Sequence, residues 1–431
     1  MIFDLGDQFQ RLKWAFSSCK NGAWGTEPNG DGDVICIRAA DFDGQLGRLK
    51  NSERTLRSID SETFEKVSLS YGDIIIEKSG GGEKQLVGRA AIFDGDEPSF
   101  TSNFLARCRP AQGVDPRYLN YLLLAIYNGR GTYPHLKQST GIQNLDLGSF
   151  LDIKVNILPL KTQCRIAKFL DEKTARIDGL IEKKRALLNR LAEKRQALIT
   201  CAVSKGLNPD APMKPSGVDW LGDIPAHWDC KRLRFAMLTN PSKREIKLED
   251  DEFVSFVPME AVGEYGGLDL ETEKELADVV DGYTYFADND VVIAKITPCF
   301  ENGKGALASG LKNGVAFGTT ELHVMRGHEN LLSEYLFYIS MSYPFAKIGE
   351  SEMYGSGGQK RLPERYLKNF RIGLPSTDEQ IEIIEYINRV NGNSDLQAEK
   401  ALESVNKLSE YRAAIITSAI TGRIEELLHE S

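Results

Sequence analysis

Residues 191–200 read Leu191-Ala192-Glu193-Lys194-Arg195-Gln196-Ala197-Leu198-Ile199-Thr200, and residues 408–417 read Leu408-Ser409-Glu410-Tyr411-Arg412-Ala413-Ala414-Ile415-Ile416-Thr417. A shift of 217 positions superimposes the leucine, glutamate, arginine and threonine of the two stretches. Each stretch lies in a long segment with helical spacing, at about 162–205 and 379–423, and each segment follows a globular-looking stretch of comparable length. A repeat of about 200 residues is a duplicated domain rather than a solenoid. The sequence therefore predicts two globular halves, each ending in one long helix.

The two long segments carry apolar residues at two heptad positions over several turns, which is the pattern of a coiled coil. Arg195 and Arg412 interrupt this seam at the same place. Residues 161–205 hold twelve Lys or Arg against five Asp or Glu, whereas residues 378–423 hold five against eight. The unequal charges favour an antiparallel pair of helices, roughly 60 Å long at 1.5 Å per residue. The expected interface residues are Leu170, Ile177, Ile181, Leu188, Leu191 and Leu198 in the first helix and Ile387, Val405, Leu408 and Ile415 in the second.

The globular halves share an order of short β-rich runs, a helix of bulky residues and a last strand closed by Leu-Pro. A polar loop is expected before that strand, at 139–145 in the first half and 357–361 in the second, with Gln143 matched to Gln359. Most residues between these matching segments differ, which indicates that the two halves share one fold but have different surface residues. The predicted fold class is mixed, α+β, with a pseudo-two-fold internal repeat.

Boundaries follow from this order and from a connector rich in Pro and Gly at 206–217. We expect a first globular domain at 1–158, a first long spacer helix at 159–207, a second globular domain at 208–375 and a second long spacer helix at 376–431.

Composition narrows the class of protein. The chain has 431 residues, enough for two or three domains with their own cores, and its seven cysteines include no Cys-x-x-Cys pair. Reduced thiols, the absence of a signal peptide and the absence of a long apolar run together predict a cytoplasmic protein. The net charge of −9 is unfavourable for binding nucleic acid. A nucleic-acid-binding protein with this charge must gather its Lys and Arg on one face, or bind nucleic acid together with a more basic partner.

Three stretches carry a resemblance to a known family. Residues 213–228 read MKPSGVDWLGDIPAHW, the pair Thr162-Gln163 or Glu379-Gln380 follows shortly after Leu-Pro at the start of each long helix, and residues 411–422 read YRAAIITSAITG. Over nearly the whole chain, this layout resembles the DNA-specificity subunit of type I restriction-modification enzymes. The Trp-Leu-Gly lead-in of the second half has no counterpart before the first half.

The resemblance implies a non-catalytic subunit of bacteria or archaea. Its two globular domains would be target-recognition domains, each reading one half of a bipartite, asymmetric DNA target, and the paired helices would set the length of the unread spacer. Two methylation subunits would bind the helices and bring S-adenosylmethionine for adenine methylation. A restriction subunit, with ATP and Mg, is a further partner that the resemblance allows. No cofactor or metal is expected in this chain itself.

Two other classes remain as alternatives. A self-contained DNA methyltransferase or nuclease needs motifs that are not found: Asn208-Pro209 and Asn240-Pro241 lack the second proline and the aromatic residue of an amino-methyltransferase, and no Gly-x-Gly fingerprint follows a strand. The five histidines form no metal-ligand motif. A coiled-coil assembly protein without DNA reading is weakened by the divergent surfaces of the two halves, because a spacer protein needs no such variation.

Polar side chains near the last strand of each half are the expected DNA contacts. Arg, Lys, Gln and Asn read base edges in the major groove, and Lys and Arg bind phosphates. The expected base-reading residues are Gln143 and Asn144 in the first half and Gln359, Lys360 and Arg361 in the second; Lys78, Arg89, Lys295 and Lys304 are expected at phosphates or bases. Gln143 and Gln359 have a second interpretation, a scaffold hydrogen bond, because the match makes them recur in both halves.

Overall fold

A computed structural model describes residues 9–44, 46–81, 85–139, 142–356 and 358–428. The chain divides into two compact units, which are described separately. Unit 1 comprises Met1–Lys184 and Glu403–Ser431, and unit 2 comprises Arg185–Leu402. We call the globular part of unit 1 head 1 (9–158) and that of unit 2 head 2 (208–375). The cysteines all lie in the described residues and are unpaired.

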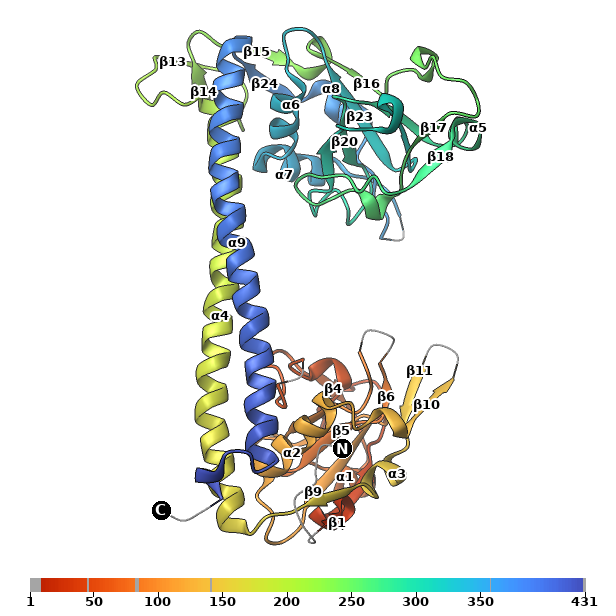
Figure 1. The fold of residues 1–431 in the computed structure, drawn as a ribbon, viewed down its shortest axis with the longest axis vertical. Coiled ribbons are helices and arrows are strands. Elements are labelled where there is room, and N and C mark those ends of the chain that lie inside the picture. The colour runs from red at the N-terminus through yellow and green to blue at the C-terminus, as the bar shows by residue number, and fades with distance from the viewer. Residues whose placement is uncertain (1–8, 45, 82–84, 140–141, 357, 429–431) are drawn as a thin grey trace. The chain divides into compact units, whose positions relative to one another are not determined.

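Two long helices, α4 (Leu160–Lys205) and α9 (Thr377–Ile420), each contribute one part to unit 1 and one part to unit 2 (Figure 1). In unit 1, Ile177 and Ile181 of α4 form a buried cluster with Val405 and Ile415 of α9. In unit 1, residues 166–170 of α4 share a core with residues 416–420 of α9, and Asp178 meets Arg412. In unit 2, residues 199–203 of α4 share a core with residues 383–387 of α9, and Arg195 meets Asp395, so the helices run antiparallel in each unit. Burial of this apolar seam stabilises helices that would be marginal alone.

The arginines that interrupt the seam each meet an aspartate of the other helix. In unit 1, Arg412 is only 6% exposed and donates to both carboxylate oxygens of Asp178, at 2.8 and 3.3 Å, and to the carbonyl oxygen of Leu46. In unit 2, Arg195 donates to Asp395 at 2.9 Å, with 28% of the arginine side chain exposed. The same pair is therefore buried in one unit and partly solvated in the other.

Head 1 contains two main sheets. One has the strand order β2-β9-β5-β7 and the other β4-β3-β8, while β1 pairs with β12 beside the start of α4. All three isoleucines of β5 are fully buried, because this central strand is covered on both faces. The bounds are β1 (Phe9–Arg11), β2 (Phe16–Asn21), β3 (Val34–Ile37), β4 (Thr55–Arg57), α1 (Ser61–Val67), β5 (Ile74–Glu77), β7 (Ala90–Ile92), β8 (Ser99–Thr101), β9 (Leu105–Pro110), α2 (Pro116–Asn128), α3 (Leu147–Leu151) and β12 (Lys154–Asn156).

Head 2 repeats this topology. Its sheets have the orders β16-β23-β20-β21 and β18-β17-β22-β19, and β15 pairs with β24. A hairpin of β13 and β14 forms part of the segment 213–228 that precedes the main sheets of head 2. The bounds are β13 (Met213–Pro215), β14 (Asp223–Pro225), β15 (Asp229–Arg232), β16 (Met237–Thr239), β17 (Phe253–Val257), β18 (Glu273–Glu275), α5 (Leu276–Val279), β19 (Thr284–Ala287), β20 (Val291–Ala294), β21 (Gly305–Leu307), β22 (Val315–Gly318), β23 (Leu322–Gly327), α6 (Ser333–Ser340), α7 (Tyr343–Glu352), α8 (Glu364–Asn369) and β24 (Arg371–Leu374).

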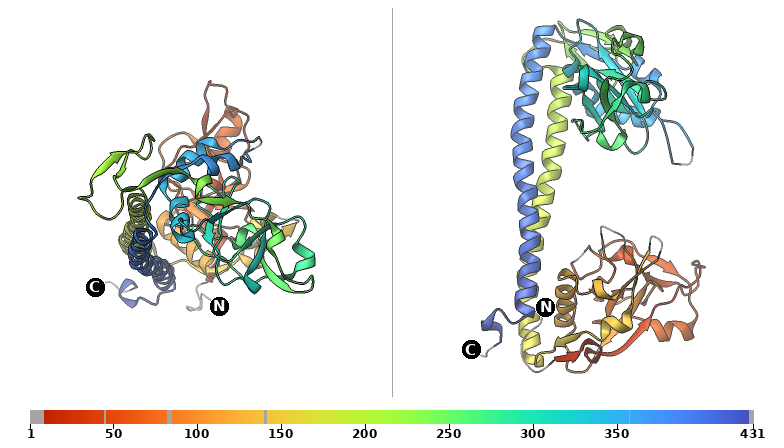
Figure 2. Two further views of the ribbon diagram at one scale, coloured as in Figure 1. Left: turned by 90° about the horizontal axis from the view of Figure 1, so that it is seen from above. Right: turned by 45° about the vertical axis from the view of Figure 1, so that its right-hand side comes forward.

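One buried glutamine fixes each head on its long helix. Gln163 of α4 accepts from the backbone amide of Asp115 at 2.8 Å and donates to the Leu158 carbonyl at 2.6 Å. Gln380 of α9 accepts from the amide of Leu332 at 2.9 Å and donates to the Pro375 carbonyl at 3.1 Å. The glutamine that marks the start of each helix in the sequence therefore satisfies backbone groups that would otherwise be buried without partners. In unit 1, helix α2 also lies against the helix pair (Figure 2), where Tyr121 donates to Asp171.

The mixed α+β fold with long paired helices is confirmed, and one local prediction is wrong. The segment 139–145 is not simply a polar loop: β10 (Leu136–Ser139) and β11 (Ile142–Leu145) form a hairpin, and β11 also pairs with β6 (Ser79–Gly80). Residues 140–141 between the strands, and residue 357 of the corresponding segment of head 2, lie outside the described residues. The four-part division of the chain remains a prediction.

Candidate nucleic-acid interface

Backbone hydrogen bonds align the polar segments of the two heads. The Leu145 amide donates to the Lys78 carbonyl at 2.7 Å, and the Leu362 amide donates to the Lys295 carbonyl at 2.7 Å. Leu145 and Leu362 therefore occupy equivalent places, as do Lys78 and Lys295.

This alignment corrects the sequence match by one residue. Asn144 pairs with Ser79, and Arg361 forms a bridge with Ile296, the residue that follows Lys295 as Ser79 follows Lys78. Asn144 is therefore equivalent to Arg361, and Gln143 to Lys360 rather than to Gln359. The argument that one glutamine recurs in both heads does not hold. We call each such segment, with the lysine beside it, the reading edge of its head.

Lys78 lies at the reading edge of head 1 and is held there by one polar contact. Its Nζ donates to the Asn21 side-chain oxygen at 2.8 Å, at the end of β2. Burial lowers the pKa of this lysine. Asn144 accepts a hydrogen bond from the Ser79 hydroxyl at 2.6 Å, which leaves its amide nitrogen as a donor for a ligand.

Gln143 points inward rather than toward solvent. It is 6% exposed, and its side-chain oxygen accepts from the amide of Val87 at 3.3 Å. This geometry fits the scaffold interpretation of that residue.

Arg89 forms a buried ion pair within head 1. Its Nε and Nη2 donate to the two carboxylate oxygens of Glu77, at 2.9 and 2.8 Å, and only 11% of its side chain is exposed. Burial by itself lowers the pKa of Arg89, but the hydrogen bonds and charge of Glu77 more than reverse this and leave the pKa raised. Both carboxylate oxygens of Glu77 thus accept hydrogen bonds from Arg89. A DNA phosphate would have to compete with Glu77 for the Arg89 guanidinium.

In head 2, Lys304 stands where head 1 has Arg89, and it forms no ion pair with any residue that the structure describes. The amide of Glu77 donates to the Arg89 carbonyl as the amide of Ala294 donates to the Lys304 carbonyl, so Arg89 and Lys304 are equivalent. The Lys304 Nζ donates to the Met259 carbonyl at 2.8 Å. Lys295 is half-buried at the end of β20.

Arg361 and Lys360 form the exposed part of the head 2 reading edge. The Arg361 guanidinium binds both oxygens of Glu321, at 3.0 and 2.6 Å, and this bond holds the pKa of Glu321 below its usual range. The pair fixes the direction of a side chain that is 47% exposed. Gln359 and Lys360 are exposed beside it.

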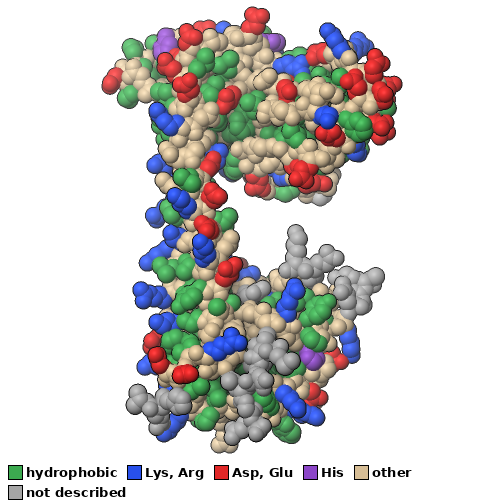
Figure 3. Space-filling view, viewed as in Figure 1, with side chains coloured by type: hydrophobic (Ala, Val, Ile, Leu, Met, Phe, Trp, Pro, Cys, Tyr) green, Lys and Arg blue, Asp and Glu red, His purple; other side chains and the backbone are tan. Residues whose placement is uncertain are grey.

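Charge disfavours another part of head 2 as a DNA surface. Figure 3 shows acidic side chains gathered at the end of head 2 that carries β18 and α5. Exposed acidic residues there are Glu249, Asp250, Asp251, Glu273, Glu275, Asp278 and Asp281. A phosphate backbone would be repelled from this end, whereas the reading edge carries Lys360 and Arg361.

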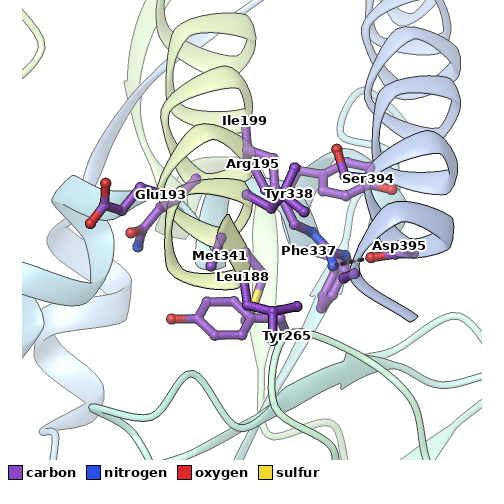
Figure 4. Close-up of a pocket in the computed structure, with 14 residues that line it drawn as sticks. Leu188, Glu193, Arg195, Ile199, Tyr265, Phe337, Tyr338, Met341, Ser394 and Asp395 are labelled. Carbon is purple, nitrogen blue, oxygen red and sulfur yellow. Dashed lines mark hydrogen bonds and ion pairs between the residues drawn. The ribbon is translucent and has the colours of Figure 1, made fainter. Parts of the chain in front are cut away.

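The expected helix-pair residues lie in several environments. Leu170 packs in the main core of unit 1 and Ile387 in that of unit 2. Leu408 packs against the cluster of Ile177 and Val405, and Leu198 is half-buried. Leu188 and Leu191 line a cavity of about 250 Å³ in unit 2, between α4, α9 and head 2 (Figure 4). The ion pair of Arg195 and Asp395 lies at its wall.

Within the described ranges, no three or more His, Cys, Asp and Glu side chains are grouped to hold a metal ion. Those ranges also contain no helix that is both long and apolar enough to cross a membrane. Sequence reasoning missed the partners that decide what each basic residue can do, namely Asn21, Glu77, Met259 and Glu321. Their pairing depends on strand register, which no motif in the sequence marks.

Comparisons with known proteins agree with this architecture. Residues 17–190 match the family model described as type I restriction modification DNA specificity domain. The specificity subunits of the type I restriction enzymes EcoAI and EcoEI of Escherichia coli are 37% identical over 209 residues and 34% identical over 212 residues, and each match covers 48% of this chain and 35% of the relative. The chain thus spans about a third of the length of these curated relatives.

A solved structure supports the fold over the whole chain. A chain described under "Structural basis underlying complex assembly and conformational transition of the type I R-M system" aligns with a TM-score of 0.68, covering 98% of this chain and 100% of that chain. Its sequence identity is 14%, so this likeness concerns the fold alone.

Proposed function

We propose that this chain is a specificity subunit of the type I restriction-modification family, and that it reads a bipartite, asymmetric DNA target and directs adenine methylation by partner subunits to it. The relatives are named as specificity subunits, and the proposal assigns the same non-catalytic role here. Head 1 and head 2 act as two target-recognition domains, and each reads one half of the target.

The observation that carries the proposal is the equivalence of the two reading edges. The same backbone bonds, from Leu145 to Lys78 and from Leu362 to Lys295, hold both edges. The side chains that the edges present differ, with Asn144 in head 1 where head 2 has Arg361. A protein that reads two different sequences with one fold needs a constant backbone and variable polar groups. An assembly protein does not.

The residues are assigned from their geometry. Arg361, oriented by Glu321, is proposed to bind a guanine edge with its guanidinium fork, and Gln359 and Lys360 contact neighbouring bases. In head 1, the Asn144 amide is proposed to contact a base edge, and Lys78 a phosphate. Lys295 and Lys304 are proposed at phosphates. Gln143 and Arg89 are proposed to support the scaffold instead, because each already meets a buried partner.

The proposed partners are double-stranded DNA, two methylation subunits on the long helices and, for cleavage, restriction subunits. S-adenosylmethionine belongs to the methylation subunit in this scheme, and ATP and Mg to the restriction subunit. The helices α4 and α9 are proposed to set the number of unread base pairs.

Methylome sequencing of cells that hold the methylation subunit, with and without this chain, tests the proposal. We expect a bipartite motif methylated at adenine, present only with the chain. In cells with the variant Lys360→Ala, Arg361→Ala, we expect methylation of that motif to be lost, although the variant still assembles with the methylation subunit. Methylation by the purified chain alone would establish the enzyme alternative, and an unchanged methylome would overturn DNA reading.

A further inference from the structure

Two arginines of head 2 face each other across paired strands. Arg232 of β15 and Arg371 of β24 are direct cross-strand partners. In head 1, Arg11 and Lys154 hold the same positions in β1 and β12. Side chains directly opposite on antiparallel strands lie about 5 Å apart at Cβ, so like charges there repel and destabilise the pair. Such repulsion is reduced where a carboxylate or another anion lies beside the two positive charges.

Head 1 supplies a carboxylate for this purpose. Asp152 accepts from Arg11 Nη1 at 3.3 Å and from Lys13 Nζ at 2.9 Å. Hydrogen bonds from both lysine and arginine hold the pKa of Asp152 below its usual range. The aspartate is therefore ionised at neutral pH and offsets part of the local positive charge.

Head 2 has no carboxylate at that place. The Leu12 amide donates to the Ile153 carbonyl at 2.9 Å, and the Leu233 amide donates to the Phe370 carbonyl at 2.9 Å, so Ile153 and Phe370 are equivalent. The residue before each is Asp152 in head 1 and Asn369 in head 2. An amide cannot offset the charges of Arg232 and Arg371.

These residues line a pocket of about 420 Å³ in head 2. Its walls include a third arginine, Arg365 of α8, together with Asn369 and the ring of Trp220, which stacks on Phe370 at 4.8 Å. Glu352 is the one carboxylate among the lining residues. Within the described part of the chain, neither Glu352 nor any other carboxylate forms an ion pair with Arg232, Arg365 or Arg371. The pocket is therefore electropositive, in a chain whose net charge is −9.

The pocket lies next to the reading edge of head 2. The Arg365 guanidinium is 5.9 Å from the ring of Tyr354, and the Tyr354 amide donates to the carbonyl of Arg361 at 3.2 Å. Tyr354 thus connects the pocket to the backbone of the reading edge at Arg361. The polyanion already proposed to lie along the reading edge is DNA, and the guanidinium fork matches the oxygens of a phosphate.

We propose that Arg232, Arg365 and Arg371 bind a backbone phosphate of the DNA that flanks the half-site read by head 2. This inference rests on the proposed DNA reading and adds a contact outside the reading edge. The bound phosphate offsets the repulsion between Arg232 and Arg371. Head 1 makes no such contact, because Asp152 occupies the equivalent place. The two heads therefore differ in their phosphate contacts, because head 2 binds one more backbone phosphate than head 1.

The test transfers the carboxylate of head 1 to head 2. The variant Asn369→Asp, and separately Arg371→Gln, are assembled with the methylation subunit, and affinity for a duplex carrying the methylated motif is measured from about 0.05 to 0.3 M salt. Each lost phosphate contact reduces the slope of log affinity against log salt by about 0.9, which corresponds to roughly eightfold weaker binding at 0.1 M salt. The methylated motif is expected to stay the same. The control Lys312→Gln removes a cation near the acidic end of head 2 and is expected to leave the slope unchanged.

An unchanged slope in both variants, in proteins that unfold at the wild-type temperature, would overturn the inference. Weaker assembly with the methylation subunit at an unchanged slope would also overturn it, and would assign the pocket to an acidic protein segment. The proposed function fails by a different result, namely a wild-type complex that does not prefer its methylated motif over other DNA.

Discussion

Head 1 and head 2 share one scaffold but present different groups at their reading edges. In head 1 the edge is a regular three-stranded sheet, and its basic residues meet partners within the head, such as Asn21 for Lys78 and Glu77 for Arg89. In head 2 the equivalent edge is an irregular segment in which Arg361 is oriented by Glu321 and Lys360 is exposed. The side chains of the reading edge can therefore differ between the heads, because the residues that stabilise the fold lie elsewhere in each head.

Those fixing groups recur in both heads. Arg109 binds the buried Asp73 at 2.9 Å, and Arg326 binds the buried Asp290 at 2.6 Å. Each aspartate also accepts a hydrogen bond, at 2.8 Å, from the backbone amide three residues before it and so closes a turn. The turn needs a positive φ, supplied by Gly72 in head 1 and by Asn289 in head 2, the two residue types that adopt it most readily.

The largest expected difference lies in the helix pair. Arg412→Ala removes the nearest partner of the buried Asp178 and leaves only Arg48, at 3.8 Å, so we expect a loss of about 3 kcal/mol in the free energy of unfolding. Arg195→Ala removes the equivalent pair in unit 2, where both side chains are partly solvated, and we expect at most about 1 kcal/mol. Denaturant unfolding of the two variants measures both values. Equal losses would mean that burial does not distinguish the two pairs.

The reading edges are expected to give the next effect. Arg361→Ala removes the proposed guanine contact and is expected to weaken binding of the methylated motif by about 1 to 3 kcal/mol, with relaxed preference at one base pair. Arg89→Ala in head 1 is the contrasting variant: it should lower stability, because Glu77 loses its partner, but leave base preference unchanged. Binding to a panel of single-base variants of the motif separates the two. Relaxed base preference in the Arg89 variant would contradict the assignment.

The smallest effect concerns pH. Burial, together with the nearby charge of Lys295, lowers the pKa of His323. The hydrogen bond of its ring nitrogen to the Leu362 carbonyl and the charges of Glu364 and Glu321 raise this pKa, but they do not outweigh burial. The unfolded chain therefore binds a proton that the folded chain resists, so this contribution to stability is lost as the pH falls below the ordinary histidine pKa of about 6.5. Head 1 has Ala106 at the equivalent strand position. His323→Gln should flatten the loss between pH 7 and 5, as followed by thermal unfolding, and an unchanged profile would exclude the histidine as its source.

The parts of the fold that the sequence predicted are those with strong periodicity. The duplicated helix, the buried strand after Asp73 and the strand before each Leu-Pro all follow from apolar spacing. The β10–β11 hairpin was not predicted, because most of its residues are polar and β11 also pairs with β6, a distant segment. Long-range pairing of this kind leaves no local signal.

The sequence predicted candidate residues that the structure brings together at one edge of each head, and their contacts with DNA stay a prediction. Individual residues were harder to assign, because a basic side chain looks the same whether it is free or paired. Arg89 is an example: only the register of β5 and β7 places it on Glu77. The one-residue offset between Gln143 and Lys360 likewise depends on backbone hydrogen bonds, which spacing between glutamines does not reveal.

Exchange of one head tests the central claim most directly. Residues 1–157 are replaced by the corresponding segment of a relative with a different target, the chain is produced with the methylation subunit, and the methylome is sequenced. Because each head is proposed to read its own half-site, we expect one half of the methylated motif to change and the other half, with the spacer, to stay the same. A change in both halves, or in neither, would contradict the account.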